Sequence, residues 1–260
     1  MGLIPERKKV LAVPRFEDLH LLIFGRQGAG KTSFCNGDPD TVTIAAEPGS
    51  DFVETRDVKT RDWVTFQRVV MEVHESRKSH PHDISAVVID IVDNLYEYCS
   101  DHICQRLKIA HPSDKKDFGK SWAEITKEWT GWLTSLYDVV SLRFITHQVE
   151  VEEERENELG LDQKYTCLAP RFSSNRGAKF LDGIVSAVGH MYVNKRGQHC
   201  ITFKQNARCA AKDRTGILCE LGEIVLPDKK TDGFRYVSEL YANKAKEMGF
   251  LVKRRFENYG

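Results

Sequence analysis

The segment Gly25-Arg26-Gln27-Gly28-Ala29-Gly30-Lys31-Thr32 limits the possible folds of this chain more than any other, because it matches the pattern G-x-x-x-x-G-K-[ST] without a mismatch. An apolar run at 19–24 predicts a buried strand that leads directly into a phosphate-binding loop. The glycines allow successive backbone N–H groups to point at one phosphate. We expect Lys31 to contact the β- and γ-phosphates and Thr32 to offer its hydroxyl to Mg²⁺ at the start of a helix. The competing interpretation is a glycine-rich turn with a surface lysine.

Length and composition allow one large α/β domain with a full core, since 41% of the 260 residues are hydrophobic and 29% are charged. The formal net charge is zero, so a nucleic-acid partner would need a local basic surface. Seven cysteines without a C-x-x-C pair argue against a disulfide framework or a zinc site and favour reduced thiols. No secretory leader or apolar run of membrane-spanning length is evident, so we expect a cytoplasmic protein without a membrane partner.

A second segment, 84–90, is a nearly continuous β-branched run that ends in Asp90 and predicts a central parallel strand. Ligands of such sheets bind at the carboxyl ends of the strands. If this strand neighbours the strand at 19–24, Asp90 lies near the phosphate loop and holds Mg²⁺ directly or through water. Asp93 could support that site, but we expect it to cap the following helix.

The rest of the chain alternates between predicted helices and strands. The tryptophan-rich helix at 121–140 could stack on bases, but its apolar stripe favours a core position. A strand at 142–146 ends at His147-Gln148, and the acidic run 150–156 predicts a solvated hairpin or a mobile loop. The basic stretch 171–179 has the composition of a single-strand contact, or equally of a polar loop with a helix start. Further elements are expected at 41–46, 63–73, 184–193, 199–204 and 236–248, and we divide the chain into a lead-in (1–18), a main domain (19–230) and a C-terminal helix with a basic tail (231–260).

The order of these motifs resembles the RecA-like ATPase core of P-loop proteins. The strand ending in Asp90, with 92–95 after it, and the turn Ala210-Ala211-Lys212-Asp213-Arg214-Thr215-Gly216 are similar to segments of phage RecA/Rad-like proteins of the Sak single-strand-annealing type. The resemblance covers about 19–220. It implies an α/β fold with a mostly parallel central sheet flanked by helices, and antiparallel strands toward the C-terminus.

The resemblance also implies roles for individual residues. Glu47 would orient the attacking water, and Gln148 would sense the γ-phosphate at the start of a DNA-facing loop, 149–176, with His147 able to share that task. Lys212 and Arg214 would act in trans on the ATP of a neighbouring subunit. Because the acidic run would repel phosphates, Arg171, Arg176 and Lys179 would make the contacts with DNA. The complete candidate set is Gly25, Arg26, Gln27, Gly28, Ala29, Gly30, Lys31, Thr32 and Phe34 for nucleotide, Lys31, Glu47 and Gln148 for catalysis, Thr32 and Asp90 for metal, Lys212 and Arg214 in trans, and Arg171, Arg176 and Lys179 for DNA.

These roles together predict a Mg²⁺-dependent ATPase that assembles as a ring or filament on single-stranded DNA and promotes annealing or strand exchange in phage recombination. A single-strand-binding protein is a further candidate partner. The alternatives are a nucleotide or metabolite kinase with the same loop, and a nucleotide-dependent scaffold with little turnover. The chain has no arginine-rich lid segment, which argues against a kinase.

Overall fold

The computed structural model describes residues 12–47, 55–80, 83–114, 118–156, 162–229 and 232–256. Its centre is a nine-stranded sheet with the strand order β12-β10-β9-β2-β6-β5-β3-β4, and β11 pairs with β9 beside this path. Six neighbouring strands are parallel: β9 (Ala187–Val193), β2 (Leu21–Phe24), β6 (Ser141–Thr146), β5 (Ala86–Asp90), β3 (Thr41–Ala45) and β4 (Arg56–Lys59). The remaining strands, β10 (His199–Thr202), β11 (Lys212–Asp213) and β12 (Glu223–Val225), are antiparallel. This arrangement confirms the α/β class that the sequence predicts.

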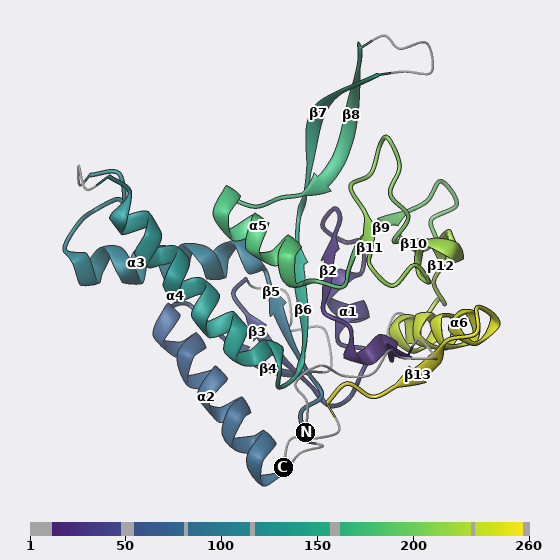
Figure 1. Ribbon diagram of the computed structural model, residues 1–260, viewed down its shortest axis with the longest axis horizontal. Helices are drawn as coiled ribbons and strands as arrows, with labels where there is room; N and C mark the ends of the chain where they lie inside the picture. Colours follow the sequence, from purple (N-terminus) through teal and green to yellow (C-terminus); the bar gives the residue numbers. More distant parts are fainter. Residues whose placement is uncertain are drawn as a thin grey trace, which may run out of the picture.

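Helices cover both faces of the sheet, as a central parallel sheet requires (Figure 1). One face packs against α2 (Trp63–Ser79), α3 (Val92–Leu107), α4 (Lys120–Tyr137) and α5 (Asn175–Ile184). The other packs against α1 (Lys31–Cys35), α6 (Gly233–Glu247) and the short 3-10 helix η1 (Phe16–Asp18). Alternate residues of β2 point to opposite faces, so Leu22 and Phe24 join one core cluster, and Leu21 and Ile23 join the other. The core role expected for the tryptophan helix is confirmed, because Trp129 is fully buried.

The strand that ends in Asp90 was expected to lie next to the strand at 19–24, and the structure differs on this point. That strand, β5, does not lie beside β2, because β6 lies between them and pairs with both in parallel. Strand order is decided by how the crossover helices pack, which a local apolar pattern does not encode. Asp90 nevertheless stays at the same edge of the sheet as the loop after β2.

A long hairpin stands out from the body at the carboxyl edge of the sheet (Figure 1). Its strands β7 (Gln148–Glu156) and β8 (Asp162–Pro170) pair antiparallel from Gln148 opposite Pro170 to Glu156 opposite Asp162. Only His147 separates β6 from β7, so the hairpin continues directly from a central strand. This confirms a hairpin for the acidic run and places Gln148 at its base.

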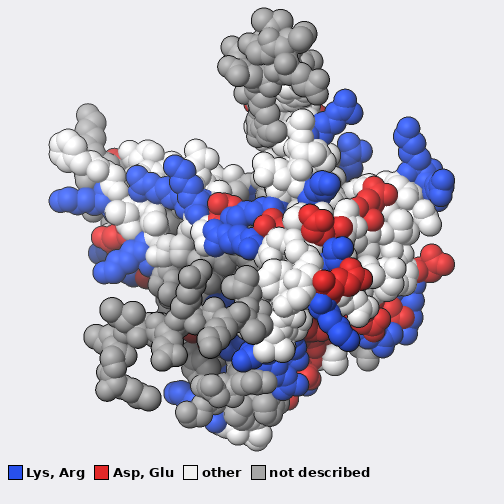
Figure 2. Space-filling view, turned by 45° about the vertical axis from the view of Figure 1, so that its right-hand side comes forward, with Lys and Arg blue, Asp and Glu red and all other residues white. Residues whose placement is uncertain are grey.

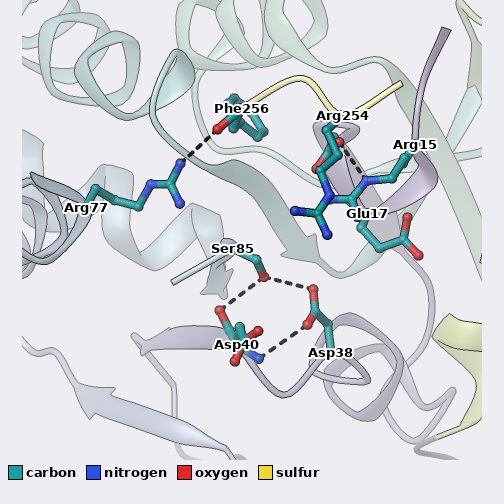
Figure 3. A pocket seen from close by; sticks show the side chains of 9 residues that line it. Arg15, Glu17, Asp38, Asp40, Arg77, Ser85, Arg254 and Phe256 are labelled. Carbon is teal, nitrogen blue, oxygen red and sulfur yellow. Dashed lines mark hydrogen bonds and ion pairs between the residues drawn. The ribbon is translucent and has the colours of Figure 1, made fainter. Parts of the chain in front are cut away.

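At the amino edge of the sheet, the first and last described segments of the chain lie against each other. Strand β1 (Ala12–Pro14) pairs in parallel with β13 (Leu251–Lys253). Beyond β13, the backbone N–H of Arg255 donates to Asp18, and the carbonyl of Phe256 accepts from Arg77. These contacts border a cavity of about 290 Å³ into which Arg254 points (Figure 3). Among the described residues, no helix is both long and apolar enough to cross a lipid bilayer.

Candidate functional site

The loop after β2 can form only with glycine at particular positions. A Cβ at Gly25 would overlap the backbone carbonyl of Met191 on β9, so this position has no room for a side chain. Gly28 (φ 80°) and Gly30 (φ 93°) adopt left-handed conformations that other residues rarely take. The helix that follows, α1, has five residues, so its dipole is small and the loop's own N–H groups provide most of the anion-binding capacity.

Lys31 lies at the centre of this loop, with 7% of its surface exposed. Its ammonium donates to the carbonyls of Gly25 at 3.0 Å and Arg26 at 2.9 Å. Burial lowers the pKa of Lys31, while the nearby carboxylates of Asp90 and Glu47 act in the opposite direction. A bound phosphate would offer this buried cation oxygen atoms with full negative charge in place of neutral carbonyls.

Thr32 and Asp90 meet across β6. The Thr32 hydroxyl donates to Oδ2 of Asp90 at 2.6 Å, although the strands that lead to these two residues are not neighbours. Burial raises the pKa of Asp90, and the Thr32 hydroxyl and the charge of Lys31 oppose that rise. A hydroxyl and a carboxylate at one point fit Mg²⁺, which prefers oxygen ligands and usually binds through one or two carboxylates plus substrate phosphates and water. The described part of the chain contains no group of three or more His, Cys, Asp or Glu side chains that could hold a metal ion.

Two further pairs extend the site along the carboxyl edge of the sheet. His147, directly after β6, places its Nε2 3.4 Å from Oε2 of Glu47, which follows β3. Gln148 places its Oε1 3.4 Å from Nε2 of His190 on β9. His190 is 6% exposed, and burial lowers its pKa to about 4, so its ring is neutral near pH 7. Lys31, Thr32, Asp90, Glu47 and Gln148 therefore occupy the carboxyl edge of the sheet, and their roles in catalysis and metal binding stay predictions.

Other candidate residues lie elsewhere. The ring of Phe34 is 1% exposed and packs edge-on against Phe16 and Phe234 in the core, so its side chain cannot line a nucleotide site. Asp93 is not the helix cap that the sequence suggests, because it lies inside the first turn of α3 and accepts the backbone N–H of Ser173 at 2.8 Å. A local pattern does not reveal this role, since the partner is 80 residues away in sequence.

The predicted trans-acting cations bind within the same chain. Lys212 donates to the side chain and carbonyl of Asp182, and Arg214 donates to the carbonyls of Asp182 and Gly183 at the end of α5. Both thus satisfy carbonyls that the helix terminus leaves open. Their action on a neighbouring subunit stays a prediction.

The three predicted DNA contacts are exposed beside the hairpin base. Arg171 lies 3.7 Å from Asp93, while Arg176 and Lys179 are on α5. All three side chains are exposed, and their role in DNA binding stays a prediction.

Three histidines contact the loop or the polar residues beside it, and the sequence does not single them out as a set. His199 on β10 places its Nδ1 2.9 Å from the carbonyl of Ala29, so the antiparallel extension of the sheet supports the phosphate loop directly. His190 and His147 contact Gln148 and Glu47, as described above. In the sequence, these three residues are recognisable only as histidines in or next to a predicted strand. That pattern is too common to distinguish them from histidines of the core.

A phosphate loop at the end of a parallel strand, with its lysine, its threonine and a carboxylate from another strand, defines a P-loop nucleotide-binding protein. A family model described as AAA domain (AAA_24) matches residues 17–215, and the chain belongs to this family. The matched range contains the whole carboxyl edge described here, from the loop to the turn with Arg214. A search of curated proteins found no matching sequence.

Proposed function

We propose that this protein is a Mg²⁺-dependent ATP hydrolase whose turnover responds to single-stranded DNA. The hydrogen bond between Thr32 and Asp90, beside the buried Lys31, is the main observation that supports ATP hydrolysis. Nucleotide binding is common to the AAA domain family. The response to DNA rests on the sequence resemblance and on exposed cations near the site.

Each site residue has a role in the proposed reaction. The loop N–H groups and Lys31 would hold the β- and γ-phosphates. Thr32 and Asp90 would hold Mg²⁺, which supplies positive charge next to the transferring phosphoryl group. Glu47 would accept a hydrogen bond from the attacking water and align it with the γ-phosphorus, while His147 at 3.4 Å fixes the carboxylate. Charge that develops on the phosphoryl oxygens would be stabilised by Lys31, which is already buried and in place.

Steady-state ATP hydrolysis with Mg²⁺, measured with and without single-stranded DNA, tests this proposal. We expect Lys31→Ala to lose both ATP binding and turnover, because the loop loses its buried charge. Glu47→Gln keeps the shape of the side chain but weakens its hold on water. It should therefore lower kcat by roughly 100-fold or more and leave the Kd for ATP nearly unchanged.

The same variants separate the alternatives. A scaffold with little turnover would bind ATP and be indifferent to Glu47→Gln, and a kinase would turn over only with an acceptor. Hydrolysis that persists in Lys31→Ala would contradict the proposal. Hydrolysis that is lost in Lys31→Ala but unaffected by DNA would keep the hydrolase and remove the DNA response.

The finer part of the proposal is annealing or strand exchange during phage recombination, with self-association and a single-strand-binding protein as partners. The sequence resemblance alone supports it. A strand-annealing assay with two complementary oligonucleotides is its direct test.

A further inference from the structure

We propose that the cavity between the phosphate loop, β9 and the hairpin base binds unstacked bases of a single-stranded nucleic acid. This inference rests on the DNA response proposed above and names the surface that would carry it. The cavity has a volume of about 660 Å³. Its walls come from the loop (Arg26, Gln27), from β9 and β10, from the hairpin base (Gln148, Leu168) and from the segment after β10.

One wall of the cavity ends in a stack of three aromatic rings. Phe24 on β2 lies 4.8 Å from His190 on β9, and His190 lies 5.1 Å from Tyr192, with interplanar angles of 24° and 23°. Exposure increases along the stack, from fully buried Phe24 to half-buried Tyr192. The Tyr192 hydroxyl donates to Glu223, which fixes the ring. A planar base can extend this stack on Tyr192, because every nucleobase has a π-face and stacking does not depend on sequence.

The charge of the cavity also suits a polynucleotide. Its lining includes Arg26 and Arg208 and no carboxylate among the described residues. Further exposed cations stand on the two loops beside it, Lys195 and Arg196 before β10 and Lys204 after it. Figure 2 shows several Lys and Arg side chains on this side of the molecule next to the hairpin, with Asp and Glu side chains among them. Within the described parts of the chain, none of these five cations forms an ion pair, so their charge is available to phosphates.

Two features favour a strand over the base of the bound ATP. The volume is larger than one base requires, and exposed cations are present on the adjoining loops as well as in the lining, as a phosphate backbone requires and a single nucleotide does not. Duplex DNA does not fit, because its bases are paired and stacked. The exposed acidic residues Glu150 and Glu152 would keep the strand near the hairpin base and off its arm.

The cavity is connected to the hydrolytic site through Gln148. This residue lines the cavity and contacts His190, whose ring lies in the middle of the stack. A base stacked on Tyr192 could therefore shift Gln148, the residue expected to sense the γ-phosphate, through the contacts Tyr192–His190 and His190–Gln148. These two contacts would couple DNA binding to ATP hydrolysis.

The test measures binding of a fluorescent oligo-dT to the full chain with Mg²⁺ and a non-hydrolysable ATP analogue. Tyr192→Leu should weaken binding roughly 5- to 150-fold, the range for losing one stacked base. Tyr192→Phe keeps the ring without the bond to Glu223 and should bind within about twofold of the original protein. Arg208→Gln should reduce the slope of log K against log salt by about one, while Arg235→Gln on α6 removes an equal charge elsewhere and should not. A 2-aminopurine in the strand should lose fluorescence on binding, and Tyr192→Leu should abolish that loss.

Different failures have different meanings. If oligo-dT binds equally well to Tyr192→Leu and Arg208→Gln, and Arg176→Gln with Lys179→Gln weakens it instead, the cavity is not the site and the DNA response stands. If Tyr192→Leu weakens ATP but not tripolyphosphate or oligo-dT, the cavity holds the base of ATP and the inference is wrong. If the original protein binds no oligo-dT, this inference and the DNA response both fail, while loss of hydrolysis in Lys31→Ala would still support the hydrolase.

Discussion

Gly25 illustrates how one backbone position allows the phosphate loop to form. Its Cα faces the carbonyl of Met191, and no side chain fits between the two strands there. We expect Gly25→Ala to destabilise the protein by more than about 2 kcal/mol, because either the loop or β9 must move. Thermal unfolding followed by circular dichroism measures the effect.

Gly131 is the matched control for that substitution. It lies in α4, where an added methyl group would meet nothing within 4 Å outside its own helix, and alanine is the better helix former. Gly131→Ala should therefore leave Tm unchanged or raise it by stabilising the helix by about 0.5–1 kcal/mol. Equal loss of Tm in both variants would contradict the steric explanation for Gly25.

The sequence predicted those site residues whose neighbours are fixed by a local pattern. Lys31 and Thr32 follow from the loop motif, and Asp90 from the end of a buried strand. Asp93 and Lys212 could not be predicted in the same way, because each is held by a partner distant in sequence, Ser173 and Asp182 respectively. Phe34 was misplaced because a position next to the loop in sequence points into the core in a five-residue helix.

Among the helices, Glu128 of α4 connects three elements. Its Oε1 accepts hydrogen bonds from Trp63 and Gln67 of α2 and from Trp132, and its Oε2 lies 3.5 Å from Arg106 of α3. Burial alone would raise the pKa of Glu128, but the bonds from Trp63 and Trp132 and the charge of Arg106 hold it below its ordinary value. The carboxylate therefore stabilises the packing of these helices as long as it is ionised.

The depressed pKa of Glu128 has a definite sign for stability. Its contribution is fully present above the unfolded pKa of about 4.3 and is lost as pH falls through the lower folded value. Glu128→Gln should thus lower the free energy of unfolding by about 1–2 kcal/mol at pH 7 and by less at pH 3. Urea titrations at both pH values give the comparison.

Glu124 provides the control, since it also pairs with Arg106 but is 46% exposed. Glu124→Gln should cost less than about 0.5 kcal/mol at either pH. A larger effect of Glu124→Gln than of Glu128→Gln at pH 7 would contradict the role assigned to the indole hydrogen bonds.

Element types were more predictable than element pairing. The 121–140 helix, the 142–146 strand and the hairpin all have strong local patterns, and the structure has α4, β6 and β7–β8 at these places. Helix α5 remained ambiguous because 171–179 mixes small and basic residues, and its start depends on the Ser174 side chain accepting from Gly177. The β1–β13 pair joins residues more than 200 apart, which no window along the chain can detect.

For the whole molecule, the end of the described chain acts as a clamp. Strand β13, Arg255 and Phe256 join β1, Asp18 and Arg77, and the Arg255 guanidinium lies 4.5 Å from the ring centroid of Tyr137. Deleting residues 251–260 should lower Tm by several degrees, because it frees both β1 and the C-terminal end of α2. Deleting only 257–260 keeps every contact named here, so this shorter deletion is the comparison for the longer one. Equal Tm values for the longer deletion and the intact chain would show that the clamp adds no stability.

The hydrogen bond between Thr32 and Asp90 has a consequence for the mechanics of the sheet. Because β6 lies between the strands that lead to these two residues, the bond spans three strands and its length depends on their twist. A magnesium ion held by Thr32 and Asp90 would restrict the relative movement of the strands that lead to these two residues. Because the hairpin continues directly from β6, a change in the distance between Thr32 and Asp90 would also shift the base of the hairpin.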